Sequence, residues 1–409
     1  MNIQKLRADF PALQKKWNGK HPIYFDNACM TLKPVQVIRA MDEYYNEYPV
    51  CGGRSIHKMA KKVDEKVGEA REKMQKFLGA SSPHEIVFTR NTTEGLNLVA
   101  NSLGFNKGDV VLTTDREHNS NLVPWQVQAK RRGIKHVVVH SNPDNTFDIG
   151  KFEEMLGNNR NVRLVSMVHT ANLDGYTIPA EEIIKISHDH GALVMLDGAQ
   201  SAPHKPVDVR KLDVDFFALS VHKMVGPSGM GVLYGKQELL EELEPFIVGG
   251  DTVEDTTYES AKFLPPPEKF EAGLQNYAGI IGSGAAVDYL TGVGLSNIER
   301  HEEKLNRIIT DGIKDMPGVG IIGPADPALR GGIVSFTVDM PHGDAHDIAL
   351  VLDETENIEV RSGAFCVHSW FNYNKCDAAV RASLYLYNTE EEARKFIDVL
   401  GKTIGLFNP

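Results

Sequence analysis

The sequence predicts an α/β protein whose large domain holds a mainly parallel seven-stranded sheet and whose C-terminal domain is a smaller α+β unit. Between Ile86 and Tyr234, short apolar runs alternate with helical stretches, a pattern typical of strands joined by right-handed crossovers. The seven runs are IVFT, VVLTT, HVVVH, RLVSMV, ALVMLD, DFFALS and GVLYG. Because GVLYG follows DFFALS too closely for an intervening helix, we expect GVLYG to be an antiparallel strand.

A change of composition near Gly294 predicts the second domain. A long charged amphipathic helix, SNIERHEEKLNRIITDGIKDM, precedes the apolar runs GIVSFTV, IEVRSG and AVRASLYLYN. Strands with helices between and after them are typical of an α+β unit. We therefore predict three parts: residues 1–20 as a segment packing on the small domain, 21–293 as the large domain, and 294–409 as the small domain. The proline-rich KFLPPPEKFEAG predicts an extended loop.

Length and charge argue against several classes of protein. The 409 residues, 42% of them hydrophobic, suffice for two buried cores. The net charge of −11 argues against a general nucleic-acid binder or a protein of anionic membranes. No apolar run approaches a membrane-spanning helix, and the first residues do not resemble a signal peptide. Four cysteines without a scaffold spacing suit a reducing compartment, so we expect a cytoplasmic location.

One lysine stands in an unusual place. The stretch ALSVHKMVGPSGMG, from Ala218 to Gly231, sets Lys223 between a strand end and a turn rich in glycine and proline. An amine in a tight apolar bend is costly unless chemistry uses it. Desolvation favours the neutral amine, which condenses with a carbonyl in the way that lysine holds pyridoxal phosphate. A surface lysine after a strand is the alternative for this motif taken alone.

A carboxylate upstream supports the same chemistry. The run ALVMLDGAQSAP leads an apolar strand into Asp197, at the strand end where open α/β sheets bind ligands. Pyridoxal phosphate needs an anion beside its pyridine nitrogen, because the protonated ring is the electron sink. A helix N-cap is the alternative role for Asp197 alone.

Two further motifs add a phosphate site and a proton carrier. In RNTTEGLNLVANSL, Thr92, Thr93 and Glu94 open a helix whose free amides suit a phosphate, although an ordinary helix cap has the same pattern. In DREHNSNLVPW, His118 follows the strand VVLTT. A flat imidazole there could stack on a planar cofactor and shuttle protons, or be merely solvated.

Together these motifs resemble the class V, fold-type I pyridoxal-phosphate enzymes, and specifically the cysteine desulfurase and selenocysteine lyase group. The similarity runs from IYFDNA near Ile23 to RASLYLYNT near Thr389, with several motifs in the family's order and spacing. The resemblance implies a fold-type I architecture, pyridoxal 5'-phosphate as the cofactor, and a homodimer with active sites near the interface.

The resemblance also implies roles for residues around the cofactor ring. Lys223 would form the internal aldimine and Asp197 would pair with the pyridine nitrogen. Gln200 and Asn172, the latter in HTANLDG, would face the ring hydroxyl, and His118 would lie over the ring.

Further implied residues bind the phosphate and the substrate. The implied phosphate ligands are Thr93, Ser220 and His222. The implied substrate ligands are Arg381, Asn27 and Arg361. A planar guanidinium suits a bidentate carboxylate contact, which is the role of Arg381 in the resemblance, with a structural salt bridge as the alternative.

A cysteine in the small domain separates desulfurases from plain aminotransferases in this family. VRSGAFCVHSW supplies Cys366, directly after a loop that matches the family's. A thiolate there would attack the substrate sulfur and leave alanine and an enzyme persulfide. An isolated cysteine would instead be a small buried hydrophobe.

The chain departs from the family pattern at four places. Leu274 follows Gly273 where relatives carry a threonine that reaches a neighbouring subunit's phosphate, and Phe365 replaces a histidine beside the nucleophile. Cys29 and Cys51 stand in two segments that line the active site in relatives. With Cys366 they would form a group of three thiols for relaying persulfide or holding a metal or iron–sulfur centre, although the spacing matches no compact motif. Apart from that group, we expect no metal site.

The sequence thus predicts a pyridoxal-phosphate cysteine desulfurase that converts L-cysteine to L-alanine and leaves a persulfide on Cys366 for iron–sulfur cluster or other cofactor assembly. L-Selenocysteine is an alternative substrate, and a cysteine C–S lyase or a class V aminotransferase is an alternative enzyme. A weakly catalytic sulfur carrier or scaffold, suggested by Leu274, is the alternative of another class. We expect a sulfur-acceptor protein as partner, and neither nucleic acid nor membrane.

Overall fold

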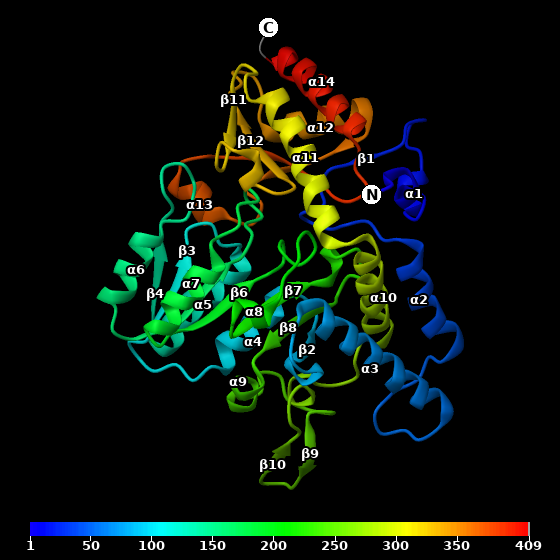
Figure 1. Cartoon of the computed structure of the whole chain (residues 1–409), viewed down its shortest axis with the longest axis vertical. Coiled ribbons are helices and arrows are strands. Elements are labelled where there is room, and N and C mark those ends of the chain that lie inside the picture. The colour runs from blue at the N-terminus through cyan, green and yellow to red at the C-terminus, as the bar shows by residue number, and fades with distance from the viewer. Residues whose placement is uncertain (408–409) are drawn as a thin grey trace.

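The computed structural model describes residues 1–407 and shows a large unit below a smaller C-terminal unit (Figure 1). A seven-stranded sheet forms the centre of the large unit, in the order β2-β8-β7-β6-β5-β3-β4. The strands are β2 (Ile86–Thr89), β3 (Val110–Thr114), β4 (Lys135–Val139), β5 (Val162–Val168), β6 (Leu193–Asp197), β7 (Phe216–Ser220) and β8 (Gly231–Gly235). Only β8 runs antiparallel to its neighbours, as the short connection from β7 predicts.

Alternating side chains of these strands pack on helices at the two faces of the sheet. In β7, Phe217 and Leu219 belong to the core on one face, whereas Phe216 and Ala218 belong to the core on the other. The helices that contribute to the first core are α2 (Val35–Glu47), α3 (Lys58–Leu78), α6 (Ile149–Asn158), α7 (Ala180–Asp189), α8 (Val209–Leu212) and α10 (Tyr277–Val293). Those on the second face are α4 (Thr92–Ser102), α5 (Asn119–Arg132) and α9 (Gln237–Glu242).

The C-terminal unit is an antiparallel sheet covered by helices. Its strand order is β11-β12-β15-β14, with bounds β11 (Val319–Ile322), β12 (Ile333–Val338), β14 (Arg361–Gly363) and β15 (Ala379–Ser383). Three helices share its core: α11 (Leu295–Ile313), α12 (Ala345–Glu356) and α14 (Glu390–Phe407). The short α13 (His368–Tyr373) follows β14 and lies against the large unit (Figure 1). The unit has the α+β composition that the sequence predicts.

The N-terminal segment connects the two units. In the predicted 1–20 part, Arg7 of α1 (Ile3–Arg7) pairs with Glu392 of α14 at 2.8 Å, whereas Phe10 packs edge-on against Tyr289 of α10. The next strand, β1 (Ile23–Tyr24), pairs in parallel with β13 (Ile358–Glu359). Ile23 and Phe25 therefore lie in the core of the C-terminal unit, although they fall inside the predicted 21–293 part.

A hairpin extends from the large unit at its far end (Figure 1). It pairs β9 (Val253–Thr256) with β10 (Ala261–Phe263), and the loop predicted over KFLPPPEKFEAG begins within β10. No sequence pattern predicts this hairpin, because its side chains are mostly exposed and lack an apolar alternation. Within residues 1–407, no single helix is long and apolar enough to cross a membrane, although α10 and α11, bent by 71°, pass that test as a pair.

Candidate active site

A cavity of about 440 Å³ opens at the ends of the sheet strands, between the large unit and the Cys366 loop. The sequence-predicted residues that line it are Thr93, His118, Asn172, Asp197, Gln200, Ser220, His222, Lys223, Arg361, Cys366 and Arg381, together with Cys29. Parallel strands place their carboxyl ends at one edge of a sheet, where α/β proteins bind ligands. Residues from distant parts of the chain therefore converge on one site.

Lys223 and Asp197 follow neighbouring strands and meet in this cavity. Asp197 ends β6, and its Oδ1 accepts a hydrogen bond from the backbone N–H of Ala199 at 3.0 Å. Burial raises the pKa of Asp197, while Ala199 and Lys223 oppose the shift. Lys223 ends the 3₁₀ turn after β7, and burial lowers the pKa of its amine, against the attraction of Asp197. The pair thus supplies an amine biased toward the neutral form and a sheltered carboxyl group.

The N-terminus of α4 forms one wall of the cavity. A Cβ at Gly231 of β8 would lie 2.5 Å from Cα of Asn91, so only glycine allows this helix to approach the sheet so closely. Asn91 caps the helix, and the N–H of Thr92 donates to Oγ of Ser220 at 2.9 Å. Thr93 remains exposed to the cavity, beside Ser120 at 2.7 Å between hydroxyl oxygens. Amides and hydroxyls at a helix N-terminus suit a phosphate group.

His118 caps α5 and faces the cavity. Its Nδ1 accepts a hydrogen bond from the N–H of Ser120 at 3.1 Å and lies 2.9 Å from Oγ of the same serine. Burial lowers the pKa of His118 to about 3, helped by Lys223 and Arg381. The imidazole is therefore neutral near pH 7, with Nδ1 fixed and Nε2 left for a ligand.

Two amide side chains carry buried oxygens without partners. Nδ2 of Asn172 donates to the carbonyl oxygen of Phe365 at 2.8 Å, and Nε2 of Gln200 donates to that of Ala28 at 2.7 Å. Oδ1 of Asn172 and Oε1 of Gln200 are buried without any hydrogen bond. Buried polar atoms are normally paired, so both oxygens indicate a missing donor group. With the amine, the carboxyl group and the helix N-terminus, they fit pyridoxal phosphate, whose ring hydroxyl can donate to one of these two oxygens.

Two arginines share the carboxylate of Asp26. Arg381 is buried, with Nη1 donating to the carbonyl oxygen of Asn172 at 3.0 Å and Nη2 lying 3.4 Å from Asp26 Oδ1. Its Nε has no partner. Arg361 is more exposed and places Nη2 at 3.1 Å from Asp26 Oδ2. A buried guanidinium with a free N–H suits a substrate carboxylate.

The Cys366 loop closes the cavity from the small unit. Phe365 and Cys366 have φ angles of 51° and 59°, in the left-handed region that favours glycine. Asn172 holds the carbonyl oxygen of Phe365, and the N–H of Asn119 donates to that of Cys366 at 2.8 Å. The Phe365 ring lies under the Arg381 guanidinium at 4.8 Å. These contacts hold an otherwise unfavourable backbone with the exposed Cys366 thiol beside the cavity.

Other residues singled out from the sequence lie outside the cavity lining. The structure corrects the prediction that Asn27 is a substrate ligand, because the side chain of Asn27 is fully buried. Its Nδ2 donates to the carbonyl oxygen of Ser383 at 2.7 Å, and its Oδ1 accepts a hydrogen bond from Tyr387. Its role is to attach the N-terminal segment to β15. Cys51 and Leu274 are exposed and do not line the cavity either. The three-thiol group is therefore reduced to Cys29 and Cys366 within this chain, and residues 1–407 contain no cluster of three metal-binding side chains.

Sequence reasoning missed several residues of the site. Asp26 orients both arginines, and its only signal was its place in IYFDNA. Lys33 donates through Nζ to the carbonyl oxygen of His222 at 2.9 Å and so anchors the turn that carries Lys223. Burial lowers the pKa of Lys33 to about 7. His368 lines the cavity from α13, and no pattern in the sequence indicated this contact.

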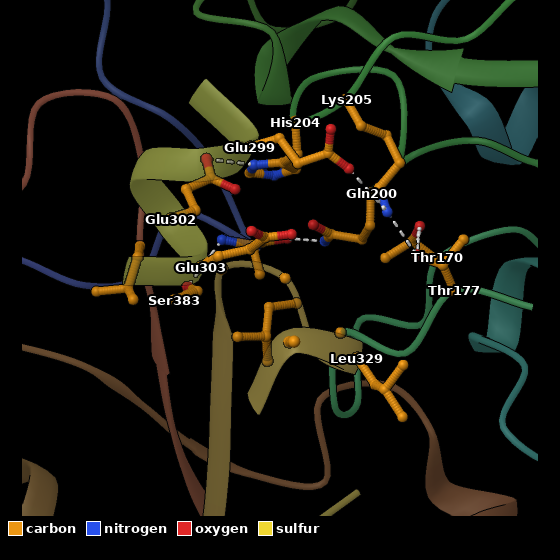
Figure 2. Close-up of a pocket in the computed structure, with 17 residues that line it drawn as sticks. Thr170, Thr177, Gln200, His204, Lys205, Glu299, Glu302, Glu303, Leu329 and Ser383 are labelled. Atoms are coloured by element: carbon orange, nitrogen blue, oxygen red, sulfur yellow. Dashed lines mark hydrogen bonds and ion pairs between the residues drawn. The ribbon is translucent and has the colours of Figure 1, made fainter. Parts of the chain in front are cut away.

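Gln200 also lines a second, smaller cavity of about 140 Å³ (Figure 2). It shares Ala28, Thr170 and Gln200 with the first cavity. Contacts between polar side chains join its walls: His204 Nδ1 lies 2.8 Å from Glu302 Oε1 of α11, and Lys205 Nζ lies 3.6 Å from Glu299 Oε1 of the same helix. These contacts attach the small unit to the turn after β6, and thereby fix the wall that carries Gln200.

Comparisons with known proteins identify the family of this chain. The family model for "Aminotransferase class-V" matches residues 23–396. A probable cysteine desulfurase of Halalkalibacterium halodurans is 40% identical, covering 98% of this chain and 97% of that protein. The apo structure of a cysteine desulfurase from Thermococcus onnurineus NA1 has a TM-score of 0.92 at 38% identity, covering 98% of each chain. A C-DES variant solved with glycine covalently linked to its pyridoxal-phosphate cofactor has a TM-score of 0.83 at 25% identity, covering 97% and 98%.

The fold and the site define a fold-type I enzyme that depends on pyridoxal phosphate. The chain belongs to the class-V aminotransferase family, and its relatives place it in that family's cysteine desulfurase group.

Proposed function

We propose that the protein is a cysteine desulfurase that converts L-cysteine to L-alanine and leaves the sulfur as a persulfide on Cys366. The observation that carries this proposal is the presence of Cys366, Lys223 and Arg381 around one cavity. The amine and the buried arginine suit an amino-acid substrate, and the exposed thiol faces the place where its side chain would lie. The full-length similarity to cysteine desulfurases supports the same reaction.

Pyridoxal phosphate, when bound, withdraws the electrons of the substrate Cα–H bond and so allows the substrate to release its sulfur. The residues that would hold it are Asp197 at the pyridine nitrogen, Asn172 and Gln200 at the ring hydroxyl, and Thr93, Ser220 and His222 at the phosphate. Lys223 would attach it through Nζ.

Arg381 and Lys223 act on two groups at the substrate Cα: Arg381 binds the carboxylate, and Lys223 takes the Cα proton. The free Nε–H of Arg381 and its neighbouring Nη2 point a planar guanidinium at the substrate carboxylate, while Asp26 keeps it in place. The substrate amine would replace Lys223 on the cofactor, and burial lowers the pKa of the freed Nζ, which makes it available as a base for the Cα proton. His118, neutral near pH 7, holds a ring nitrogen in position to move a proton near the substrate sulfur.

Cys366 takes the sulfur. Its thiolate attacks the substrate sulfur, the Cβ–S bond breaks, and its electron pair remains with the carbon fragment, which gains protons to become alanine. A new S–S bond joins Cys366 Sγ to the transferred sulfur. Cysteine and one thiol thus give alanine and one persulfide, without an added oxidant.

We further propose a homodimer and a separate sulfur-acceptor protein. Exposed apolar side chains on the large unit support a subunit contact: Tyr258 in the β9–β10 hairpin is fully exposed, Ile56 is 87% exposed and Leu274 is 69% exposed. The exposure of Cys366 supports delivery to a second protein. Light scattering of the purified protein tests the dimer: a mass of one chain would contradict it.

The variant Cys366→Ser tests the proposed reaction. It should retain the cofactor absorbance of the parent protein, because the thiol acts after the cofactor is bound, yet form no persulfide and no alanine from L-cysteine. Cys376→Ser is the matched control, since Cys376 lies outside the cavity lining. Equal alanine formation by Cys366→Ser and the parent would overturn the proposal.

A further inference from the structure

The active-site cavity contains a second thiol that the proposed reaction does not use. Cys29 lines the same cavity as Cys366 but belongs to a distant part of the chain, the segment between β1 and α2. Its sulfur faces charged groups instead of an apolar core. We propose that Cys29 is a second sulfur-accepting nucleophile, which takes sulfur from the Cys366 persulfide and stores it inside the cavity. This inference rests on the proposed function, since it requires a persulfide on Cys366.

The backbone around Cys29 is fixed to the small unit. Its N–H donates to the carbonyl oxygen of Asp26 at 3.2 Å, and the preceding N–H of Ala28 donates to Oγ of Ser383 at 2.9 Å. The side chain of Asn27 is hydrogen-bonded on both sides in the same turn. Cys29 is therefore held at the cavity wall, as Cys366 is by the hydrogen bonds that Asn172 and Asn119 donate to its loop. Two thiols held at the wall of one cavity suit a transfer between them.

Arg361 contacts the Cys29 thiol and lies in the strand before the Cys366 loop. Its Nη2 lies 2.6 Å from Sγ of Cys29, and the same nitrogen is held at 3.1 Å by Asp26 Oδ2. Arg361 belongs to β14, the strand that leads into the Cys366 loop. A guanidinium in hydrogen-bond contact with sulfur stabilises negative charge on it, and the thiolate is the nucleophilic form of cysteine. Of the four cysteines, only Cys29 has a side-chain contact with an arginine among the hydrogen bonds of residues 1–407.

The transfer balances without an additional reagent. The Cys29 thiolate attacks the terminal sulfur of the Cys366 persulfide, and a new S–S bond forms between them. The bond from that sulfur to Cys366 Sγ breaks, and its electron pair leaves with Sγ as a thiolate. One persulfide and one thiol are consumed and one of each is formed, so the oxidation level is unchanged. Cys366 is then free to accept sulfur from a second substrate molecule.

The number of alanine molecules formed in the first burst tests this inference. Holoenzyme is mixed rapidly with a few equivalents of L-cysteine and no other thiol, and the alanine formed in the initial burst is counted per bound cofactor. The parent should release two equivalents, and Cys29→Ser should release one. Cys51→Ser is the matched control, because Cys51 is exposed and does not line the cavity, and it should release two.

A second measurement locates the added sulfur on the peptides of the parent protein, so it does not depend on how any variant folds. After the burst, alkylation and peptide mass spectrometry of the parent should find one added sulfur on Cys29 and one on Cys366. Sulfur on Cys366 alone, or a burst unchanged by Cys29→Ser, would overturn the inference and leave the proposed function intact. A Cys366→Ser protein that still forms alanine would instead overturn the proposed function. The two failures are thus distinguishable.

Discussion

Asn172 Nδ2 donates to the carbonyl oxygen of Phe365 at 2.8 Å, so a residue from the wall of the cofactor cavity holds the loop that carries Cys366. The other amide atom, Oδ1, is buried without a partner and faces the same cavity. One side chain therefore contacts both the loop of the nucleophile and the place proposed for the ring hydroxyl. Because the amide has a single orientation, the two contacts are made together.

Replacing this amide should affect both functions. In Asn172→Ala the loop loses one anchor and the cofactor loses one acceptor. The loss of one hydrogen bond of about 1.5 kcal/mol corresponds to roughly a tenfold slower alanine formation. Cofactor release during dialysis should also be faster than for the parent. If only one of the two rates changes, the double role of Asn172 is wrong.

Lys223 should be the residue that carries the cofactor. Its amine lies beside Asp197 in the cavity, and burial lowers its pKa toward the neutral form. Borohydride treatment of the yellow holoenzyme should therefore attach the cofactor irreversibly to the peptide that contains Lys223. Peptide mass spectrometry identifies the labelled residue, and a label on any other lysine, including Lys33, would remove the basis of the site.

Asp26 should orient both substrate-side arginines. Its two carboxylate oxygens lie 3.1 Å from Arg361 and 3.4 Å from Arg381. Asp26→Asn removes the charge but keeps the shape, so we expect KM for L-cysteine to rise about tenfold with a smaller change in kcat, which corresponds to about 1.4 kcal/mol. Asp288→Asn, which breaks an exposed ion pair with Lys73, is the control. Equal KM values for both variants would exclude this positioning role.

Lys33 should make stability depend on pH. Burial lowers its pKa from 10.5 to about 7 in the folded protein. Between these values the unfolded chain binds one proton more than the folded chain, so raising the pH stabilises the fold, by at most about 1.4 kcal/mol per pH unit. Below pH 7 both states carry the proton and the dependence ends.

The variant Lys33→Met isolates this dependence. Compared with the variant, the parent should gain thermal stability as the pH rises from 7 to 9. The unfolding midpoints of both proteins at several pH values measure the effect. Parallel curves for the two proteins would show that folding does not lower the pKa of Lys33.

The sequence predicts the large unit well because local pattern and tertiary role agree there. Each of the seven apolar runs is a strand, and Phe216 to Leu219 alternate between two cores as a strand covered on both faces should. The short gap before β8 was sufficient to predict its antiparallel direction. Lys223 and Asp197 could be found from the sequence because Asp197 ends β6 and Lys223 lies in the turn directly after β7. The carboxyl ends of parallel strands lie at one edge of the sheet, so the two residues were expected at the same site.

Contacts between distant segments were less predictable. Nothing local to Ile23 and Phe25 indicates that they complete the core of the C-terminal unit, because the pairing of β1 with β13 spans over three hundred residues. Asn27 was misassigned for the same reason: its hydrogen bonds to Ser383 and Tyr387 exist only in the folded chain. The motif shows that an amide is needed there, but it does not show which way the amide faces.

The first turnover with L-cysteine tests the central claim most directly. Holoenzyme without reductant should form L-alanine, with one sulfur atom found by mass spectrometry on the peptide that contains Cys366. That result follows from a thiol that accepts sulfur beside an arginine that binds the substrate carboxylate. Pyruvate and ammonia in place of alanine, with Cys366 unmodified, would show a lyase that releases sulfide directly and would contradict the account.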